Sequence, residues 1–209
     1  EAGKNALWTG VPVRTFPKKP REHKKFGVLV VGGSQGAEGL NRMMDEALPL
    51  LAPHAEKLFV IHMRGRGKGA GLEEAYRRFG IEGKILDYID DMAWAYAQAD
   101  AVVARAGAVT LAELSALGKV SVLVPLPRSA GGHQRDNALA FERAGAALCL
   151  EGARATGAAL AEALVSLLES PERLRSMRER SRSLGRPDAA ERVADVLEDI
   201  IQHKGSVKA

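Results

Sequence analysis

The chain is poor in the residues that several common functions require. Its 209 residues include a single cysteine, Cys149, so an internal disulfide is excluded, and the apolar run around it predicts a buried small side chain rather than a nucleophile. Aromatic residues make up only 5%, without the stacking platforms of single-strand nucleic-acid binders. No apolar run approaches the roughly 20 residues that span a bilayer, and the N-terminus shows no signal-peptide pattern. We therefore expect one cytoplasmic domain.

Positive charge, in contrast, is concentrated near the start. Six lysines and arginines against one glutamate lie between residues 14 and 25, which accounts for the whole net charge of +4. Because Pro17 and Pro20 interrupt this segment, we interpret it first as an exposed linker. A patch for acidic lipid headgroups or phosphates is the alternative.

The rest of the chain alternates apolar runs with amphipathic patterns. The predicted strands are 27–31, 58–62, 84–86, 101–104, 120–124 and 146–150. Helices are expected around 40–51, 70–79, 91–98, 108–117, 134–144 and 156–169, with two tail helices at 171–184 and 188–202. This order predicts an α/β protein with a Rossmann-like, doubly wound parallel sheet, in which ligands bind beyond the carboxyl ends of the strands.

The turn Gly32-Gly33-Ser34-Gln35-Gly36 follows the first strand and opens a helix, which indicates a phosphate ligand. Its glycines lack the spacing of a dinucleotide fingerprint, and the second strand ends in His62-Met63-Arg64 instead of an acidic residue. The P-loop pattern fails both here and at 65–69. A tight turn with Ser34 as helix cap is the structural alternative.

Three later segments also follow predicted strands. Asp90 and Asp91 open a helix, and we favour a cap over a metal site because no further ligand accompanies them at suitable spacing. The small residues 106–108 open another helix, whose free N–H groups suit a diphosphate, while Glu113 one turn later suits a ribose diol. His133, Gln134 and Asn137 follow a Gly-Gly hinge and offer neutral groups for a sugar.

Taken together and in order, these motifs resemble the C-terminal half of the MurG family, which transfers N-acetylglucosamine from UDP to undecaprenyl-diphosphoryl-N-acetylmuramoyl-pentapeptide. The motifs are GGSQGA (32–37), YIDDM (88–92), RAGAVTLAEL (105–114), HQRDNA (133–138), ERAGAA (142–147) and DAAERVAD (188–195). The resemblance covers nearly the whole chain, including Arg14 at the entry to this half.

The resemblance implies a GT-B glycosyltransferase whose donor, UDP-N-acetylglucosamine, is held by this half without a metal ion or cofactor. Its implied division is a linker (1–25), a UDP-sugar-binding domain (26–185), and a crossover helix and tail (186–209). Arg14 and Ser34 would contact the diphosphate, Ile89 the uracil through its backbone, and Glu113 the ribose. The implied substrate-binding set is Arg14, Gly33, Ser34, Gln35, Ile89, Ala108, Val109, Thr110, Leu111, Ala112, Glu113, His133, Gln134 and Asn137.

Two departures from the family follow. Ala106 stands where the family commonly has serine, and the half that would carry the lipid acceptor site and the general base is absent from this sequence. We expect donor binding without sugar transfer by this chain alone, and a peripheral position on the cytoplasmic face of the membrane. The alternatives are a subunit of a natural two-chain transferase, as in eukaryotic dolichol-lipid synthesis, and a non-catalytic nucleotide- or RNA-binding module.

Overall fold

The computed structural model describes residues 7–33, 37–127 and 132–205. Six parallel strands form one sheet in the order β3-β2-β1-β4-β5-β6. The strands are β1 (Phe26–Val31), β2 (Leu58–Met63), β3 (Glu82–Leu86), β4 (Ala101–Ala104), β5 (Val120–Leu123) and β6 (Ala147–Cys149). The predicted parallel α/β sheet is therefore confirmed.

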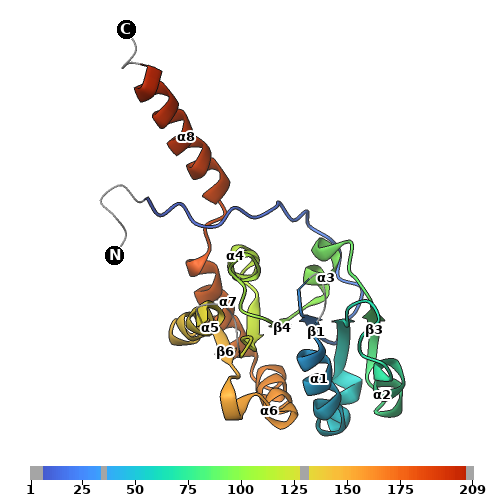
Figure 1. The fold of residues 1–209 in the computed structure, drawn as a ribbon. Helices are drawn as coiled ribbons and strands as arrows, with labels where there is room; N and C mark the ends of the chain where they lie inside the picture. The colour runs from blue at the N-terminus through green and yellow to red at the C-terminus, as the bar shows by residue number, and fades with distance from the viewer. Residues whose placement is uncertain (1–6, 34–36, 128–131, 206–209) are drawn as a thin grey trace.

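Helices cover both faces of this sheet (Figure 1). Their bounds are α1 (Glu38–Leu51), α2 (Leu72–Arg78), α3 (Met92–Gln98), α4 (Ala108–Leu117), α5 (His133–Arg143), α6 (Gly157–Leu168), α7 (Pro171–Leu184) and α8 (Ala189–Gly205). Buried side chains of α1, α2 and α6 share one core cluster, whereas those of α3, α4 and α5 share the other.

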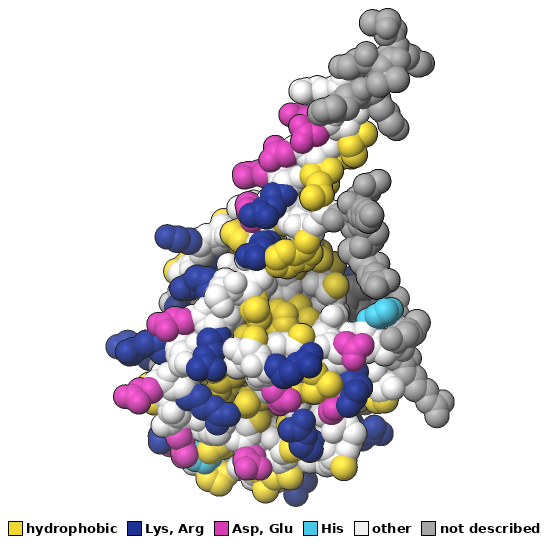
Figure 2. All heavy atoms as spheres, turned by 90° about the vertical axis from the view of Figure 1, so that its left-hand side faces the viewer, with side chains coloured by type: hydrophobic (Ala, Val, Ile, Leu, Met, Phe, Trp, Pro, Cys, Tyr) yellow, Lys and Arg dark blue, Asp and Glu magenta, His cyan; other side chains and the backbone are white. Residues whose placement is uncertain are grey.

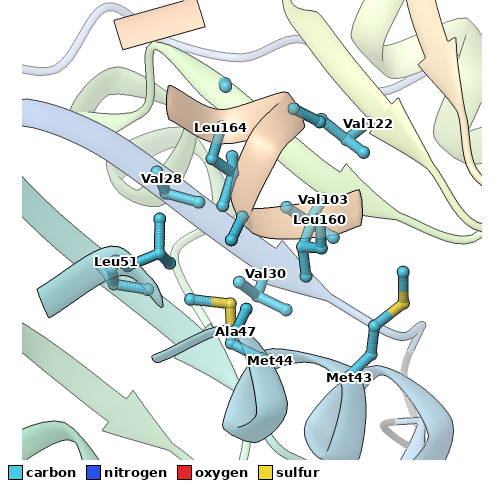
Figure 3. Close-up of a cluster of buried hydrophobic side chains, with 14 of the residues drawn as sticks. Val28, Val30, Met43, Met44, Ala47, Leu51, Val103, Val122, Leu160 and Leu164 are labelled. Atoms are coloured by element: carbon cyan, nitrogen blue, oxygen red, sulfur yellow. The ribbon is translucent and has the colours of Figure 1, made fainter. Parts of the chain in front are cut away.

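The strands supply both clusters because successive side chains point to opposite faces. Val28 and Val30 of β1 belong to the first cluster, and Leu29 and Val31 to the second. Figure 3 shows the first cluster, in which α1 and α6 meet over the sheet: Val28, Val30, Met43, Met44, Ala47, Leu51, Val103, Val122, Leu160 and Leu164. Cys149 is buried in the second cluster, as the apolar run around it predicts.

Several element boundaries differ from expectation by a few residues, those of β3 and of the link from α1 to β2 among them. β3 begins at Glu82 rather than Lys84, although Gly83 is typical of a turn. A Cβ at Gly83 would lie 2.2 Å from the Val60 carbonyl oxygen, so the glycine allows the two strands to pair closely. A 3₁₀ helix at Ala52–Lys57, with a proline in its first turn, joins α1 to β2 and was not expected.

Residues 7–25 form no helix or strand and cross the surface of the domain (Figure 1); we call this segment the strap. Gln98 is fully buried, accepts the Glu22 N–H at 2.7 Å and donates to the Pro20 carbonyl at 2.8 Å. Arg21 binds both carboxylate oxygens of Asp100. These contacts fix the strap to the end of α3 and the start of β4.

The carboxylate of Asp100 accepts hydrogen bonds from several elements. Besides Arg21, it accepts the Gly27 N–H at 2.9 Å and Arg178 Nη2 of α7 at 2.6 Å. Burial raises the pKa of Asp100, but the hydrogen bonds from Arg21 and Gly27 outweigh burial, and the net pKa lies below its usual value. The carboxylate therefore stays charged and ties the strap, β1 and α7 together.

The final helix α8 extends away from the sheet (Figure 1), and its exposed apolar residues lie along one side (Figure 2). Leu197, Ile200 and Ile201 are 55%, 46% and 69% exposed. This exposure agrees with the apolar stripe expected from 193 to 201. Within the described part of the chain, no helix has the length and apolar character needed to cross a bilayer.

A buried polar network joins α1, β2 and α2. Asn41 donates to the Arg64 carbonyl at 2.9 Å, which leaves its own oxygen to accept His62 Nε2 at 3.0 Å. The other ring nitrogen of His62 then accepts the Tyr76 hydroxyl at 3.1 Å. With Nε2 donating to Asn41, Nδ1 can accept the Tyr76 hydroxyl only while the imidazole is neutral.

Acid should therefore destabilise the fold through His62. Burial, and then the charge of Arg64, lower the pKa of His62 to about 4, whereas the unfolded side chain titrates near 6.5. The stabilisation is complete above pH 6.5 and is lost as the pH falls toward 4, by about 3 kcal/mol. Urea unfolding at pH 7 and pH 4 should show a smaller acid loss for His62→Asn than for wild type, and equal losses would contradict this role.

Candidate functional site

At the centre of the sheet, turns that are far apart in sequence meet at the carboxyl ends of the strands. The chain runs from β1 outward through β2 to β3, then crosses to β4 and continues outward on the other side. Val31 and Ala104, the last residues of β1 and β4, are register partners. The turns that follow them therefore lie side by side at the point where strand order reverses, which is the usual ligand position in such sheets.

A cavity of about 280 Å³ opens at this point. Its lining comes from the strap, the ends of β1 and β2, the turn and first residues of α3, and the first two turns of α4. Six predicted substrate-binding residues line it: Arg14, Gly33, Ile89, Val109, Thr110 and Glu113. The fold thus brings predicted residues from four separate segments to one cavity.

The start of α4 presents backbone donors to the cavity. Gly107 precedes the helix and has no side chain to cap it, and the first backbone bond runs from the Leu111 N–H to the Gly107 carbonyl at 3.0 Å. The N–H groups of Ala108, Val109 and Thr110 precede that bond, so helix geometry gives them no carbonyl partner. Together with the helix dipole, they favour an anionic ligand.

Glu113 lies one turn farther along α4, and its side chain is 14% exposed. One carboxylate oxygen accepts the Tyr96 hydroxyl at 2.8 Å, and the other lies 3.6 Å from Arg14 Nε. Burial first, and then the charge of Glu113, raise the pKa of Tyr96 far above its usual value. Tyr96 therefore remains a hydroxyl donor, and Glu113 keeps free lone pairs for a ligand.

Sequence reasoning missed the remaining walls of the cavity: Val31, Met63, Tyr88, Met92 and Tyr96. The available signal was position, because each residue ends a strand or belongs to the segment after β3. Tyr96 gave one more signal, since a buried tyrosine hydroxyl usually needs a partner. Ile89 is 3% exposed and belongs to the second core cluster, so a ligand in the cavity would meet its backbone rather than its side chain.

The structure does not bring every predicted residue into this cavity. Ser34 and Gln35 lie outside the described residues. Ala108, Leu111, Ala112 and Asn137 line a separate groove of about 620 Å³ on the other side of α4. The side-chain oxygen of Gln134 accepts the Leu126 N–H at 3.1 Å, and the side-chain nitrogen of Asn137 donates to the Ala106 carbonyl at 3.1 Å. His133 begins α5.

A larger cavity of about 700 Å³ lies between the start of α1 and the ends of β5 and β6. Arginines dominate its polar lining, but Arg135 pairs with Glu151 at 2.7 Å, and Arg105 donates to the Val124 carbonyl at 2.9 Å. It contains none of the predicted substrate-binding residues. The smaller cavity is therefore the better candidate for the ligand site, because of the residues that line it rather than its volume.

Ala106, the departure from the family pattern, is fully buried in the second core cluster. The side chain of a serine at this position would accordingly begin in the protein interior, because Ala106 does not line the cavity.

The basic residues of the strap are largely paired with the domain. Lys19 lies 2.8 Å from Asp91, and Lys25 lies 2.8 Å from Glu82, in addition to the Arg21 contact with Asp100. In the loop after β2, Arg64 pairs with Asp87 at 2.7 Å. These pairs favour the linker interpretation over an open patch for nucleic acid or acidic lipid.

Comparison with known proteins identifies the family of this chain. Residues 27–193 match the family described as the glycosyltransferase family 28 C-terminal domain. Proteins named UDP-N-acetylglucosamine–N-acetylmuramyl-(pentapeptide) pyrophosphoryl-undecaprenol N-acetylglucosamine transferase, from Myxococcus xanthus and Methylibium petroleiphilum, are 44% and 46% identical over 86% and 97% of this chain. These matches cover 47% and 57% of those proteins, so the chain spans about half the length of the curated relatives it matches.

A solved structure gives the same result. The crystal structure of Acinetobacter baumannii MurG superposes with a TM-score of 0.75 at 31% identity, covering 86% of this chain and 51% of that one. The fold of this chain is therefore that of part of a GT-B glycosyltransferase, as the family resemblance implies.

The aspartate pair before α3 caps the helix. Asp91 accepts the Trp94 N–H at 2.9 Å, which confirms the cap interpretation. Among the described residues, no group of three or more His, Cys, Asp or Glu side chains is placed to hold a metal ion.

A cap and a metal site give different responses to mutation. Asp91→Ala should lower the thermal midpoint by about 2–4 °C, because the Trp94 N–H loses its acceptor, whereas Asp91→Asn should retain most of the midpoint. The exposed neighbour variant Asp90→Ala is the control. A drop in the wild-type midpoint on adding EDTA would instead favour a metal site.

Proposed function

This chain belongs to the glycosyltransferase family 28 C-terminal domain family, and on that premise we propose that it binds UDP-N-acetylglucosamine. It would be the donor-binding part of an inverting, metal-independent transferase that converts lipid I to lipid II in peptidoglycan synthesis. The observation that carries this proposal is Glu113, held by Tyr96 one turn behind the free N–H groups of α4. The names of the relatives support the choice of donor and acceptor.

The proposed donor lies along the edge of the sheet from β3 toward β5. Uracil contacts the backbone of Ile89, and Glu113 accepts hydrogen bonds from the ribose diol. The diphosphate meets Arg14 and the N–H groups of Ala108–Thr110. The cavity of about 280 Å³ is at the lower end of small-molecule sites, which suits the nucleoside end of the ligand.

The remaining predicted residues would hold the other end of the donor. Ser34 and Gln35 would contact the diphosphate from the turn after β1, and His133, Gln134 and Asn137 would surround the sugar. Asn137 still has a free amide oxygen for this role, because its nitrogen is the atom that bonds Ala106.

The proposed reaction needs stabilisation of a leaving diphosphate. An acceptor hydroxyl oxygen attacks the anomeric carbon, the bond from that carbon to UDP breaks, and UDP leaves with the electron pair. The α4 dipole and Arg14 stabilise that negative charge in place of a metal ion. The hydroxyl proton passes to a general base, which we assign to the part of the full protein outside this chain.

We further propose that the acceptor site belongs to the other half of the full protein. The exposed stripe of α8, within 186–209, would cross back to that half, and the 620 Å³ groove with Leu7, Trp8 and Phe141 would face it. The linker (1–25), which contains the strap, and the UDP-sugar-binding domain (26–185) complete the division. The full protein would lie peripherally on the cytoplasmic face of the membrane, where its lipid-linked acceptor is.

Donor binding is directly testable with this chain. Calorimetric titration in EDTA should show binding of UDP-N-acetylglucosamine, with weaker or undetectable binding of NADH and ATP. The expected selectivity follows from contacts to uracil and ribose rather than to phosphate alone. Equal binding of all three ligands, or a requirement for a divalent cation, would contradict the proposal.

The ribose contact has its own test. Glu113→Ala should weaken UDP affinity by about 1–3 kcal/mol, the usual loss when a charged hydrogen-bond acceptor disappears. Glu82→Ala, which removes a carboxylate paired with Lys25 at the opposite end of the sheet, should leave the affinity unchanged. Unchanged affinity in Glu113→Ala would refute the ribose role.

A further inference from the structure

Tyr96 contacts the most specific residue of the cavity. Its hydroxyl donates to Glu113 Oε2 at 2.8 Å, whereas Arg14 Nε stands 3.6 Å from the other carboxylate oxygen. We infer that Tyr96 is a positioning residue that fixes the Glu113 carboxylate for the ribose diol. This inference rests on the proposed function and concerns how the same site selects a ribonucleotide.

The phenol is held in place before any ligand arrives. Tyr96 is 2% exposed and belongs to the second core cluster through α3. The Phe16 ring of the strap meets it edge-on, with ring centroids 5.3 Å apart and an interplanar angle of 86°. Asp91 fixes the start of the same helix. Core, strap and helix cap together fix the phenol ring, which holds its hydroxyl within hydrogen-bond distance of Glu113.

A glutamate without this contact would be poorly oriented. The terminal torsion of glutamate is broad, so its carboxylate samples many rotations unless a partner selects one. Arg14, the other partner at hand, is 57% exposed and is also proposed to contact the diphosphate. Tyr96 holds Oε2 from the protein side, which leaves lone pairs on both oxygens for the two ribose hydroxyls.

The same contact also keeps its direction across the working pH range. Burial and the charge of Glu113 hold the pKa of Tyr96 far above neutrality, so the hydroxyl does not lose its proton.

The test removes only the hydroxyl. Tyr96→Phe keeps the ring against Phe16, and the partial exposure of Glu113 lets water replace the lost donor, so the variant should fold. Calorimetry should show UDP affinity about 3- to 10-fold weaker than wild type. Affinity for 2′,3′-dideoxyuridine diphosphate, which lacks the diol, should not change. In a Glu113→Ala background, Tyr96→Phe should have no further effect on UDP.

Tyr76→Phe is the matched control. Tyr76 is also a buried tyrosine, 3% exposed, and its hydroxyl bonds His62 on the other side of the sheet. Tyr76→Phe should leave affinity for both nucleotides unchanged, and thermal unfolding should show that both variants are folded. Equal weakening for UDP and the dideoxy analogue in Tyr96→Phe would show a merely structural role and overturn the inference.

Failure of the proposed function gives a different result. If wild type bound UDP and the dideoxy analogue equally, Glu113 would not be a ribose site, and the inference would fall with it. If wild type preferred UDP, Glu113→Ala removed that preference and Tyr96→Phe retained it, only the role of Tyr96 would be wrong.

Discussion

The parallel pairing of β1 with β4 is the constraint on which the site depends. The register partners of these strands, from Val28–Ala101 to Val31–Ala104, are 73 residues apart in sequence. Because parallel strands end at the same edge, the turn after β1 and the start of α4 become neighbours. The segment after β3 then supplies the third side, with Ile89 and Tyr96. The binding geometry thus follows from strand order before any single side chain is considered.

The strap makes a second contribution, because it belongs to both the fold and the site. Its ion pairs and the buried amide of Gln98 attach it near the amino ends of the strands. It then passes the cavity, where Phe16 packs on Tyr96 and Arg14 approaches Glu113. Charges that a composition reading could assign to nucleic acid or membrane instead hold this segment in position. The residues of the strap therefore shape the cavity indirectly, by fixing the groups around it.

Much of this arrangement was readable from sequence because it depends on local rules. Apolar alternation gave the sheet, and the spacing from Gly107 to Glu113 placed a carboxylate one turn behind a helix start. Leu111 and Ala112 were misplaced relative to the cavity because each helical residue turns by about 100°, which directs them to the other side of α4. Met92 and Tyr96 look like ordinary core positions, and their cavity role needs the fold. The network of Asn41, His62 and Tyr76 joins three elements, so no local pattern predicts it.

Because the strap is attached to the domain, the structural unit begins earlier in the chain than the family match does. The family match begins at residue 27, within β1. A piece excised there would lose the bonds of the Gln98 amide to Pro20 and Glu22, and it would remove Arg21 from Asp100. The smallest piece that keeps these buried groups satisfied begins before Pro20. Chimaeras between relatives should accordingly be joined ahead of the strap, because the unit that keeps its buried groups satisfied begins earlier than the family match at residue 27.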